Sequence, residues 1–248
     1  MANRADILEW IHSTLNVDEF DDYCVNGLQV QGTPEIKTIV CGVSVSQRLF
    51  ELAIKKRADM ILVHHGMFWK SDKHPMKITG ILYKRLAMLI KSDINLAGYH
   101  LPLDAHPVLG NNAQIVQRLG LKIQEPVDVG FIATAAPPIL FNNLIQKVNN
   151  ILETESIVFP FGPAKTSKIL IISGGSSSAY PLALKHGADT FLAGSIKESQ
   201  VREFEEHGLN FINAGHYNTE KFGIQSLCAE IQKQFGIVCE FIDIPNPI

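Results

Sequence analysis

The feature that most constrains the fold of this chain is an internal repeat. When the sequence is shifted by 130 positions, residues 168–195 lie over residues 38–65 without a gap. Ala58-Asp59 then falls on Ala188-Asp189. Most apolar residues of the first copy likewise fall on apolar residues of the second copy. A chain that repeats one supersecondary unit is expected to fold into two related halves, because one copy alone lacks the partners to bury its sheet.

The repeat continues further along the chain with a shift of 116 positions. His100 then falls on His216, and Asp104 falls on Glu220. The difference between the two shifts means that the first copy carries 14 extra residues between its second and third strands. We therefore expect two copies of a β-α-β-loop-β-loop-α unit. The predicted lobes are residues 1–125 and residues 126–248, the latter including a linker segment.

The pattern of apolar residues and turn signals predicts the individual elements. The main expected helices are residues 5–15, 46–57 and 141–152. The main expected strands are residues 28–30, 36–43, 60–63, 94–97, 129–134, 157–161, 210–213 and 237–244. The alternation of strands and helices predicts the α/β class.

Two histidines follow the apolar run Ile61-Leu62-Val63 and precede Gly66. If the strand ends at Val63, then His64 and His65 project from its carboxyl end, where open α/β sheets bind their ligands. Imidazole is the commonest protein ligand for metals. The second copy carries Gly194-Ser195 at the equivalent position.

Six residues of these motifs form the candidate set for a metal site: His64, His65, His100, Asp104, His216 and Glu220. Four imidazoles and two carboxylates are too many for one tetrahedral zinc ion. They suit two divalent ions that share a carboxylate, and a donor set of nitrogen and oxygen is compatible with Zn, Mn, Fe, Co or Ni. Taken alone, His216 and Glu220 could also be a helix-surface pair, and Asp104 could cap the helix expected after Pro107.

Composition narrows the classes of function. The chain has 248 residues, a net charge of −3 and no long basic run, which argues against a nucleic-acid groove. It contains no signal-peptide pattern and no apolar run of the roughly 18 residues that a membrane span needs, so we expect a cytoplasmic protein. The four cysteines show no Cys-x-x-Cys spacing, which argues against a zinc ribbon and favours buried, reduced thiols.

Three motifs in this order resemble those of the NIF-three-like family. They are Val63-His64-His65-Gly66-Met67-Phe68-Trp69-Lys70, His100-Leu101-Pro102-Leu103-Asp104-Ala105-His106-Pro107 and Ala214-Gly215-His216-Tyr217-Asn218-Thr219-Glu220. The sequence is most similar to the short, YbgI-like branch, whose bacterial members are GTP cyclohydrolase I type 2 homologues. The resemblance spans nearly the whole chain.

The resemblance implies a dinuclear metal site between two α/β lobes and a toroidal homohexamer. It implies that His65, Asp104 and Glu220 hold one ion and that His64, His216 and Glu220 hold the other. His100 matches a family histidine that is not a regular ligand, so we expect it to lie beside the ligands or to donate a proton in catalysis. Relatives often carry Gly-Glu where this chain has Gly194-Ser195, which removes a carboxylate near the site.

The function implied by the resemblance is that of a metal-dependent hydrolase. In GTP cyclohydrolase chemistry, a metal hydroxide attacks C8 of guanine and formate is then lost. Phe68 and Trp69 could stack on the base and Lys70 could bind a phosphate, although Trp69 could equally be a packed lid or a subunit contact.

Two alternatives to this hydrolase remain open. One is a two-metal phosphoesterase that acts on damaged nucleotides, and the other is a metal-binding or scaffold ring without turnover. The glycine-rich stretch Ser173-Gly174-Gly175-Ser176 could hold an anion, but it lacks the pattern of a phosphate-binding loop.

Overall fold

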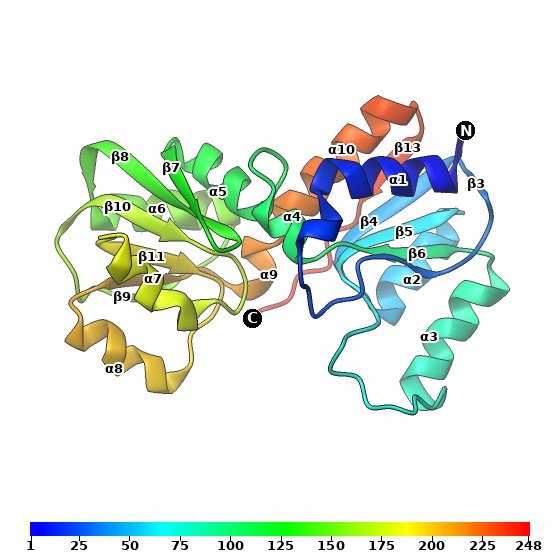
Figure 1. Ribbon diagram of the computed structural model, residues 1–248, viewed down its shortest axis with the longest axis horizontal. Helices are drawn as coiled ribbons and strands as arrows, with labels where there is room; N and C mark the ends of the chain where they lie inside the picture. Colours follow the sequence, from blue (N-terminus) through cyan, green and yellow to red (C-terminus); the bar gives the residue numbers. More distant parts are fainter. The chain divides into compact units, whose positions relative to one another are not determined.

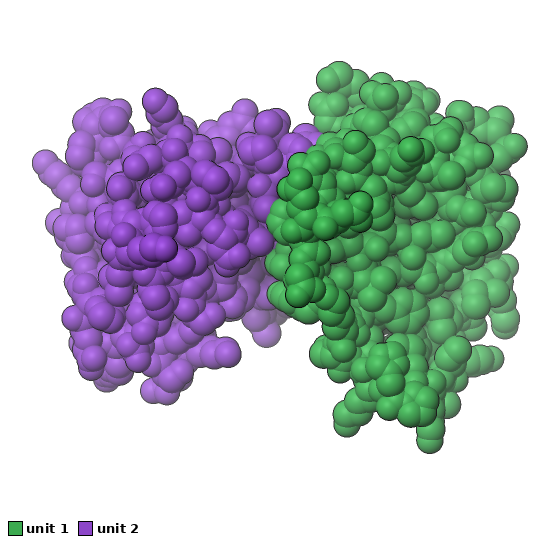
Figure 2. Space-filling model, viewed as in Figure 1, with its two compact units in different colours: residues 1–103, 224–244 green, residues 104–223, 245–248 purple.

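The computed structural model describes residues 1–248, and their contacts divide the chain into two compact units. Unit 1 comprises residues 1–103 and 224–244, and unit 2 comprises residues 104–223 and 245–248. Figure 1 labels the helices and strands, and Figure 2 colours the two units. Each unit contains its own sheet, covered by helices, so the predicted α/β class is confirmed.

Unit 1 is built on a five-stranded sheet in the order β13-β4-β5-β6-β2. Its strands are β13 (Val238–Phe241), β4 (Thr38–Ser44), β5 (Met60–His65), β6 (Asn95–Gly98) and β2 (Gly27–Val30). The first four are parallel, and β2 pairs antiparallel with β6. A separate two-stranded ladder joins β1 (Ala2–Asn3) to β3 (Glu35–Ile36).

Helices cover both faces of this sheet (Figure 1). The helices of unit 1 are α1 (Arg4–Leu15), α2 (Gln47–Lys55), α3 (Gly80–Lys91) and most of α10 (Lys221–Phe235), with a 3-10 turn at Val17–Glu19. Leu49 of α2 and Leu89 of α3 pack with Val40 and Val63 of the strands. Helix α2 begins where the Ser46 side chain accepts a hydrogen bond from the backbone N–H of Leu49, an N-cap that stabilises the first turn.

Unit 2 is built on a six-stranded sheet in the order β7-β8-β10-β11-β12-β9. Its strands are β7 (Lys122–Val127), β8 (Gly130–Leu140), β10 (Lys165–Ile171), β11 (Thr190–Ala193), β12 (Asn210–Asn213) and β9 (Ile157–Phe159). Strands β10, β11 and β12 are parallel, and the others pair antiparallel. This arrangement places two loops and a short helix at the carboxyl ends of three parallel strands.

Helices also cover both faces of the second sheet. They are α5 (Asn111–Leu119), α6 (Phe141–Leu152), α7 (Tyr180–Lys185), α8 (Glu198–Glu206) and the short α9 (His216–Thr219), with a 3-10 turn at Ser177–Ala179. Helices α5 and α6 pack on the face that carries Ile169 and Ile171. Helices α7 and α8 pack on the face that carries Leu170 and Phe191. The alternation of buried residues along β10 follows from the two-residue period of a strand.

Neither α3 nor α8 was predicted. The segments expected as loops between the second and third strands of each copy contain α3 and α8. In α3 the apolar residues Ile81 and Ile90 are 65% and 62% exposed, so the helix lacks a clean separation of apolar and polar faces. In α8 Phe204 is the one buried residue. Both segments therefore carry a weak helical pattern, and each copy has the order β-α-β-α-β.

The boundary between the units differs from the predicted boundary at residue 125. Helix α5 follows β6 of unit 1 along the chain, yet its residues Ile115 and Val116 pack with Phe131 and Ile169 of unit 2. Conversely, β13 follows β12 of unit 2 along the chain but pairs with β4 of unit 1. The chain first passes from unit 1 to unit 2 between residues 103 and 104, within helix α4 (Leu101–Ala105). Unit 2 thus contains helix α5 of the first copy, and unit 1 contains most of helix α10 of the second copy.

No helix in the chain combines the length and apolar character that crossing a bilayer requires.

Candidate metal centre

Unit 1 contains a cluster of imidazoles. Strand β5 continues through His65, so the two histidines are its last residues and do not follow a strand that ends at Val63. His64 is fully buried and His65 is half-buried. Their ring centroids lie 4.6 Å apart, and the His100 ring lies 5.0 Å from that of His64. One potential ligand atom from each of the three rings lies within 4.8 Å of the others.

In both His64 and His65, the Nδ1 atom lies within hydrogen-bonding distance of a neighbouring group in unit 1. The Nδ1 atom of His64 lies 3.0 Å from the carbonyl oxygen of Tyr99, and that of His65 lies 2.9 Å from Oγ of Ser44. Metal-binding histidines in proteins usually have one ring nitrogen held in this way, which orients the other toward the ion. The arrangement therefore leaves Nε2 as the atom of both rings that could bind an ion.

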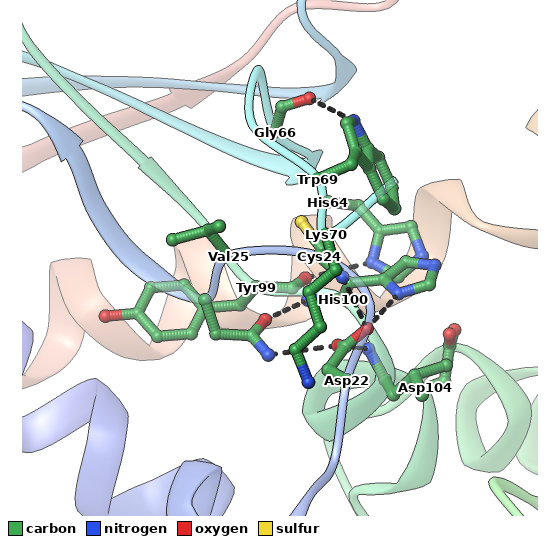
Figure 3. A network of polar contacts seen from close by, with 12 residues as sticks. Asp22, Cys24, Val25, His64, Gly66, Trp69, Lys70, Tyr99, His100 and Asp104 are labelled. Carbon is green, nitrogen blue, oxygen red and sulfur yellow. Dashed lines mark hydrogen bonds and ion pairs between the residues drawn. The ribbon is translucent and has the colours of Figure 1, made fainter. Parts of the chain in front are cut away.

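A buried carboxylate holds the third ring. Asp22 is 4% exposed, and its Oδ1 lies 2.9 Å from Nδ1 of His100. Its two oxygens also accept hydrogen bonds from the backbone N–H groups of Cys24 and Leu101 and from the Asn26 side chain, at 2.8 to 3.0 Å. Figure 3 shows Asp22 and His100 in this network. Burial raises the pKa of Asp22, but the hydrogen bonds outweigh burial and lower the pKa to about 2.

Trp69 lies beside the imidazoles and is half-buried. Its ring meets the His100 ring edge-on, with 5.3 Å between centroids, and stacks on Tyr23 at 5.7 Å. Its indole N–H donates to the carbonyl of Gly66 over 3.1 Å (Figure 3). The extra loop of the first copy thus packs an aromatic ring against the histidine cluster.

A cavity of about 530 Å³ opens next to this loop, within unit 1. It is lined by Met67, Phe68, Asp72, Lys73, Pro75, Met76, Lys77, Leu82 and Arg85. The lining combines apolar side chains with three cations, which suits a ligand that has a flat apolar part and a negative charge. Lys70, which the sequence suggested for this task, forms an ion pair with Asp21 instead.

A separate cluster lies in unit 2, where Asp104 and Glu220 are 4% and 3% exposed. A carboxylate oxygen of one lies within 4.8 Å of a carboxylate oxygen of the other. The Nε2 atom of His216 lies 3.2 Å from Oε2 of Glu220, because the two residues are four positions apart across α9. Asp104 accepts hydrogen bonds from the side chains of Asn111 at 2.8 Å and Ser173 at 3.0 Å.

Gly174 lies in the loop after β10, and its lack of a side chain leaves room for the Glu220 carboxylate. Its φ angle is +64°, and a Cβ atom there would lie 2.2 Å from Oε1 of Glu220 and 3.3 Å from Nε2 of His216. The stretch 173–176 therefore lies against a carboxylate, which disfavours the anion site that the sequence suggested.

We expect Gly174→Ala to weaken metal binding, because the new methyl group must displace the Glu220 carboxylate. Gly187→Ala is a matched control, since Gly187 has a φ of +66° but no atom within 4 Å of the added Cβ. Both variants carry the backbone strain of about 1 kcal/mol that a left-handed alanine costs. Elemental analysis of the dialysed proteins should show metal loss in Gly174→Ala alone; equal metal content in the two variants would contradict this interpretation.

The structure brings the sequence-predicted residues together within each unit: His64, His65 and His100 in unit 1, and Asp104, His216 and Glu220 in unit 2. Sequence reasoning missed the groups that hold them, namely Asp22, Ser44, Asn111 and Ser173. Asp22 and His100 are 78 positions apart, and no spacing pattern connects them.

Comparisons with known proteins agree with the sequence resemblance. The model of the Duf34/NIF3 (NGG1p interacting factor 3) family matches residues 2–247. A Haemophilus influenzae protein named GTP cyclohydrolase 1 type 2 homolog is 39% identical over 251 residues, which cover 99% of each chain.

Two solved structures are also similar along the whole chain. The protein ybgI, described as of unknown function, has 35% identity and a TM-score of 0.94, and the comparison covers 100% of both chains. A protein from Thermus thermophilus has 31% identity and a TM-score of 0.92, again over 100% of both chains.

Proposed function

Because the chain belongs to the Duf34/NIF3 family, we propose that it is a metal-dependent hydrolase acting on a purine nucleotide or a related ring. The observation that carries the proposal is the group of clustered imidazoles, of which His64 and His100 have Nδ1 held by buried groups. Anchored histidines that converge on one point are the usual construction of a protein metal site. The names of the curated relatives support the choice of substrate class.

The donor groups fit divalent metal ions. In unit 2, two buried carboxylates approach within 4.8 Å, and like charges at that distance disfavour each other unless a cation or a proton lies nearby. In unit 1, three imidazoles offer nitrogen ligands. A donor set of nitrogen and oxygen without thiolate is compatible with Zn, Mn, Fe, Co or Ni, and it disfavours Cu⁺.

We assign the ligands as the family resemblance implies. His65, Asp104 and Glu220 would hold one ion, and His64 and His216, together with Glu220, would hold the other. When bound, such a pair of ions lowers the pKa of a coordinated water toward about 7 and polarises the bond to be cleaved. Ser44 and Tyr99 orient the histidines of β5, and Ser173 orients Asp104.

His100 is the residue proposed to handle a proton. Asp22 accepts from its Nδ1–H, so Nε2 is the atom that takes or gives a proton at the substrate. A buried carboxylate that fixes the tautomer of a catalytic histidine is the arrangement found in hydrolytic triads. Trp69 covers one edge of the His100 ring and restricts the access of water to it.

The cavity beside the Trp69 loop is the proposed substrate pocket. Lys73, Lys77 and Arg85 would bind the phosphate groups, and Phe68 with Leu82 would contact the base. Arginine and lysine at the rim of an apolar pocket are the expected recognition elements for a nucleotide. Lys70 is not assigned to phosphate binding, because it pairs with Asp21.

A panel of purine nucleotides tests the proposal. The metal-loaded protein should release formate from GTP, and removing the metal with a chelator should lower the rate by at least about 100-fold, since metal activation of water contributes several kcal/mol. His100→Asn should lower kcat by about 10²- to 10⁴-fold, the usual contribution of a general acid or base. Metal content should stay unchanged in this variant, because His100 is not assigned as a ligand.

The same panel separates the alternatives. Release of phosphate without formate would replace the cyclohydrolase reaction with a two-metal phosphoesterase. An unchanged pool of every nucleotide, with metal bound, would favour a metal-binding or scaffold role and would overturn the hydrolase proposal. The toroidal homohexamer implied by the resemblance remains a prediction, which a mass measurement in solution would test.

A further inference from the structure

Three of the four cysteines converge at a place that the proposed hydrolase site does not use. Cys41 lies in the middle of β4, Cys228 lies in α10 and Cys239 lies in β13, all within unit 1. Their sulfur atoms all lie within 4.8 Å of one another, and the Sγ atoms of Cys41 and Cys239 are 3.6 Å apart. We call these three residues the thiol cluster.

The thiol cluster lies between the sheet and α10. On β4 the neighbouring residues Val40 and Gly42 face α2, where a Cβ on Gly42 would lie 2.9 Å from the side chain of Leu49. Since successive side chains on a strand alternate, Cys41 faces the opposite side, where Cys228 meets it. Figure 1 shows α10 and α2 on opposite faces of this sheet.

The three cysteines of the thiol cluster differ in how deeply they are buried. Cys41 is fully buried, Cys228 is 5% exposed and Cys239 is partly exposed on β13, the edge strand of the sheet. The cluster therefore has a closed side in the core and an accessible side at the sheet edge, where a small ion can enter.

The register of the sheet disfavours a disulfide between the two strands. Cys239 pairs with Ile39, and Phe241 pairs with Cys41, so Cys41 and Cys239 are diagonal neighbours two positions apart. Neighbouring strands lie about 4.8 Å apart and rise about 3.3 Å per residue, so Cα atoms two positions out of register in this parallel pair are about 8 Å apart. That exceeds the roughly 4.4–6.8 Å that a disulfide spans. A tetrahedral ion with Zn–S bonds of about 2.3 Å instead keeps its sulfurs about 3.8 Å apart, close to the observed separation.

We propose that Cys41, Cys228 and Cys239 form a second, thiolate-only site that binds a soft metal cation of the Zn²⁺ or Cu⁺ class. Binding a divalent ion forms three metal–sulfur bonds and releases three thiol protons to solvent, and the partly exposed side of Cys239 leaves room for a water as fourth ligand. The bound ion would fasten β13 and α10 to β4.

Titration of the reduced, metal-free, full-length protein with Cd²⁺ tests the site. Cd²⁺ bound by thiolates gives an ultraviolet charge-transfer band, whereas Cd²⁺ bound by imidazole and carboxylate groups does not. Ions in the proposed hydrolase site therefore do not contribute to this band. We expect the amplitude of the band to correspond to one cadmium–thiolate site per chain. We expect Cys239→Ser to weaken binding by at least about 10-fold, since one of three ligands is lost. Cys24→Ser is the matched control, because Cys24 is also buried but lies outside the cluster, and it should bind as the wild type does.

A second measurement does not depend on a variant folding. Bound Cd²⁺ should protect Cys239 of the wild-type protein from alkylation, and competition with Zn²⁺ and with Cu⁺ then identifies which ion binds more tightly. Glu220→Gln should leave the band intact, which separates this site from the proposed hydrolase site. A folded protein that shows no band with several equivalents of Cd²⁺, or a band that survives Cys228→Ser combined with Cys239→Ser, would overturn the proposal.

Discussion

Glu220→Gln is expected to remove most of the metal that the protein binds. Glu220 is 3% exposed, lies 3.2 Å from His216 and approaches the Asp104 carboxylate within 4.8 Å. As the proposed bridge, it contributes to both ions, and its amide replacement has the same shape without the charge. Removal of groups that merely orient a ligand already weakens metal binding by about 10- to 100-fold, so loss of the bridge should exceed about 100-fold. Elemental analysis after dialysis measures the effect.

Glu205→Gln is the matched control for this prediction. Glu205 is also in unit 2, but its side chain is 45% exposed and pairs with the exposed Arg202 on the same helix. The control should keep its full metal content and its thermal stability. Full metal content in both Glu220→Gln and His64→Ala, with both variants folded by circular dichroism, would show that the ligand assignment is wrong.

Asp22→Asn is expected to be the most destabilising of the conservative changes near the imidazoles. Each oxygen of Asp22 accepts two hydrogen bonds, and the amide group of asparagine would turn two hydrogens toward two of the donors. A buried donor left without an acceptor costs about 1–3 kcal/mol, so the change should cost about 2–4 kcal/mol. For a chain of this size, that lowers Tm by about 5–15 °C, which thermal unfolding followed by circular dichroism measures.

The adjacent residue supplies the control. The Asp21 side chain is 97% exposed and pairs with Lys70, and a surface ion pair contributes about 0–1 kcal/mol. Asp21→Asn should therefore leave Tm within a few degrees of the wild type. An equally small effect of Asp22→Asn would mean that the buried network around Asp22 contributes little to stability.

The effect of Asp22→Asn should also depend on pH. The pKa of Asp22 is lowered from 3.8 to about 2 in the folded protein, so the folded state favours the ionised form. The resulting stabilisation is fully present above about pH 4 and is lost as the pH falls toward 2. The Tm difference between wild type and Asp22→Asn should therefore shrink over that interval. A difference that stays constant would show that the charge of Asp22 is not the cause.

Strongly patterned elements agreed with the sequence prediction. The helix expected at residues 141–152 is α6 (Phe141–Leu152), because its apolar residues recur on one face and pack on one sheet. The strand expected at residues 210–213 is β12 (Asn210–Asn213). Helices α3 and α8 were missed because too few of their apolar residues are buried to produce such a pattern.

The candidate ligands could also be found from the sequence, because motif and repeat placed related polar residues after equivalent strands. The groups that orient them could not. Ser44 and His65 meet because β4 and β5 pair in one register, and Asp22 meets His100 because a loop folds back over the end of β6. The cysteines illustrate the same limit: with no spacing motif they were expected only to be buried, reduced thiols, and the sequence did not show that three of them converge.

The sequence by itself determined the α/β class, the family and the identity of the polar residues at the strand ends, since these depend on local periodicity and on short motifs. Only the tertiary structure decided which unit each helix joins, which groups hold the histidines and that Cys41, Cys228 and Cys239 form one cluster. Such contacts join residues far apart in the chain, and strand register and helix packing set them only when the whole core is buried at once.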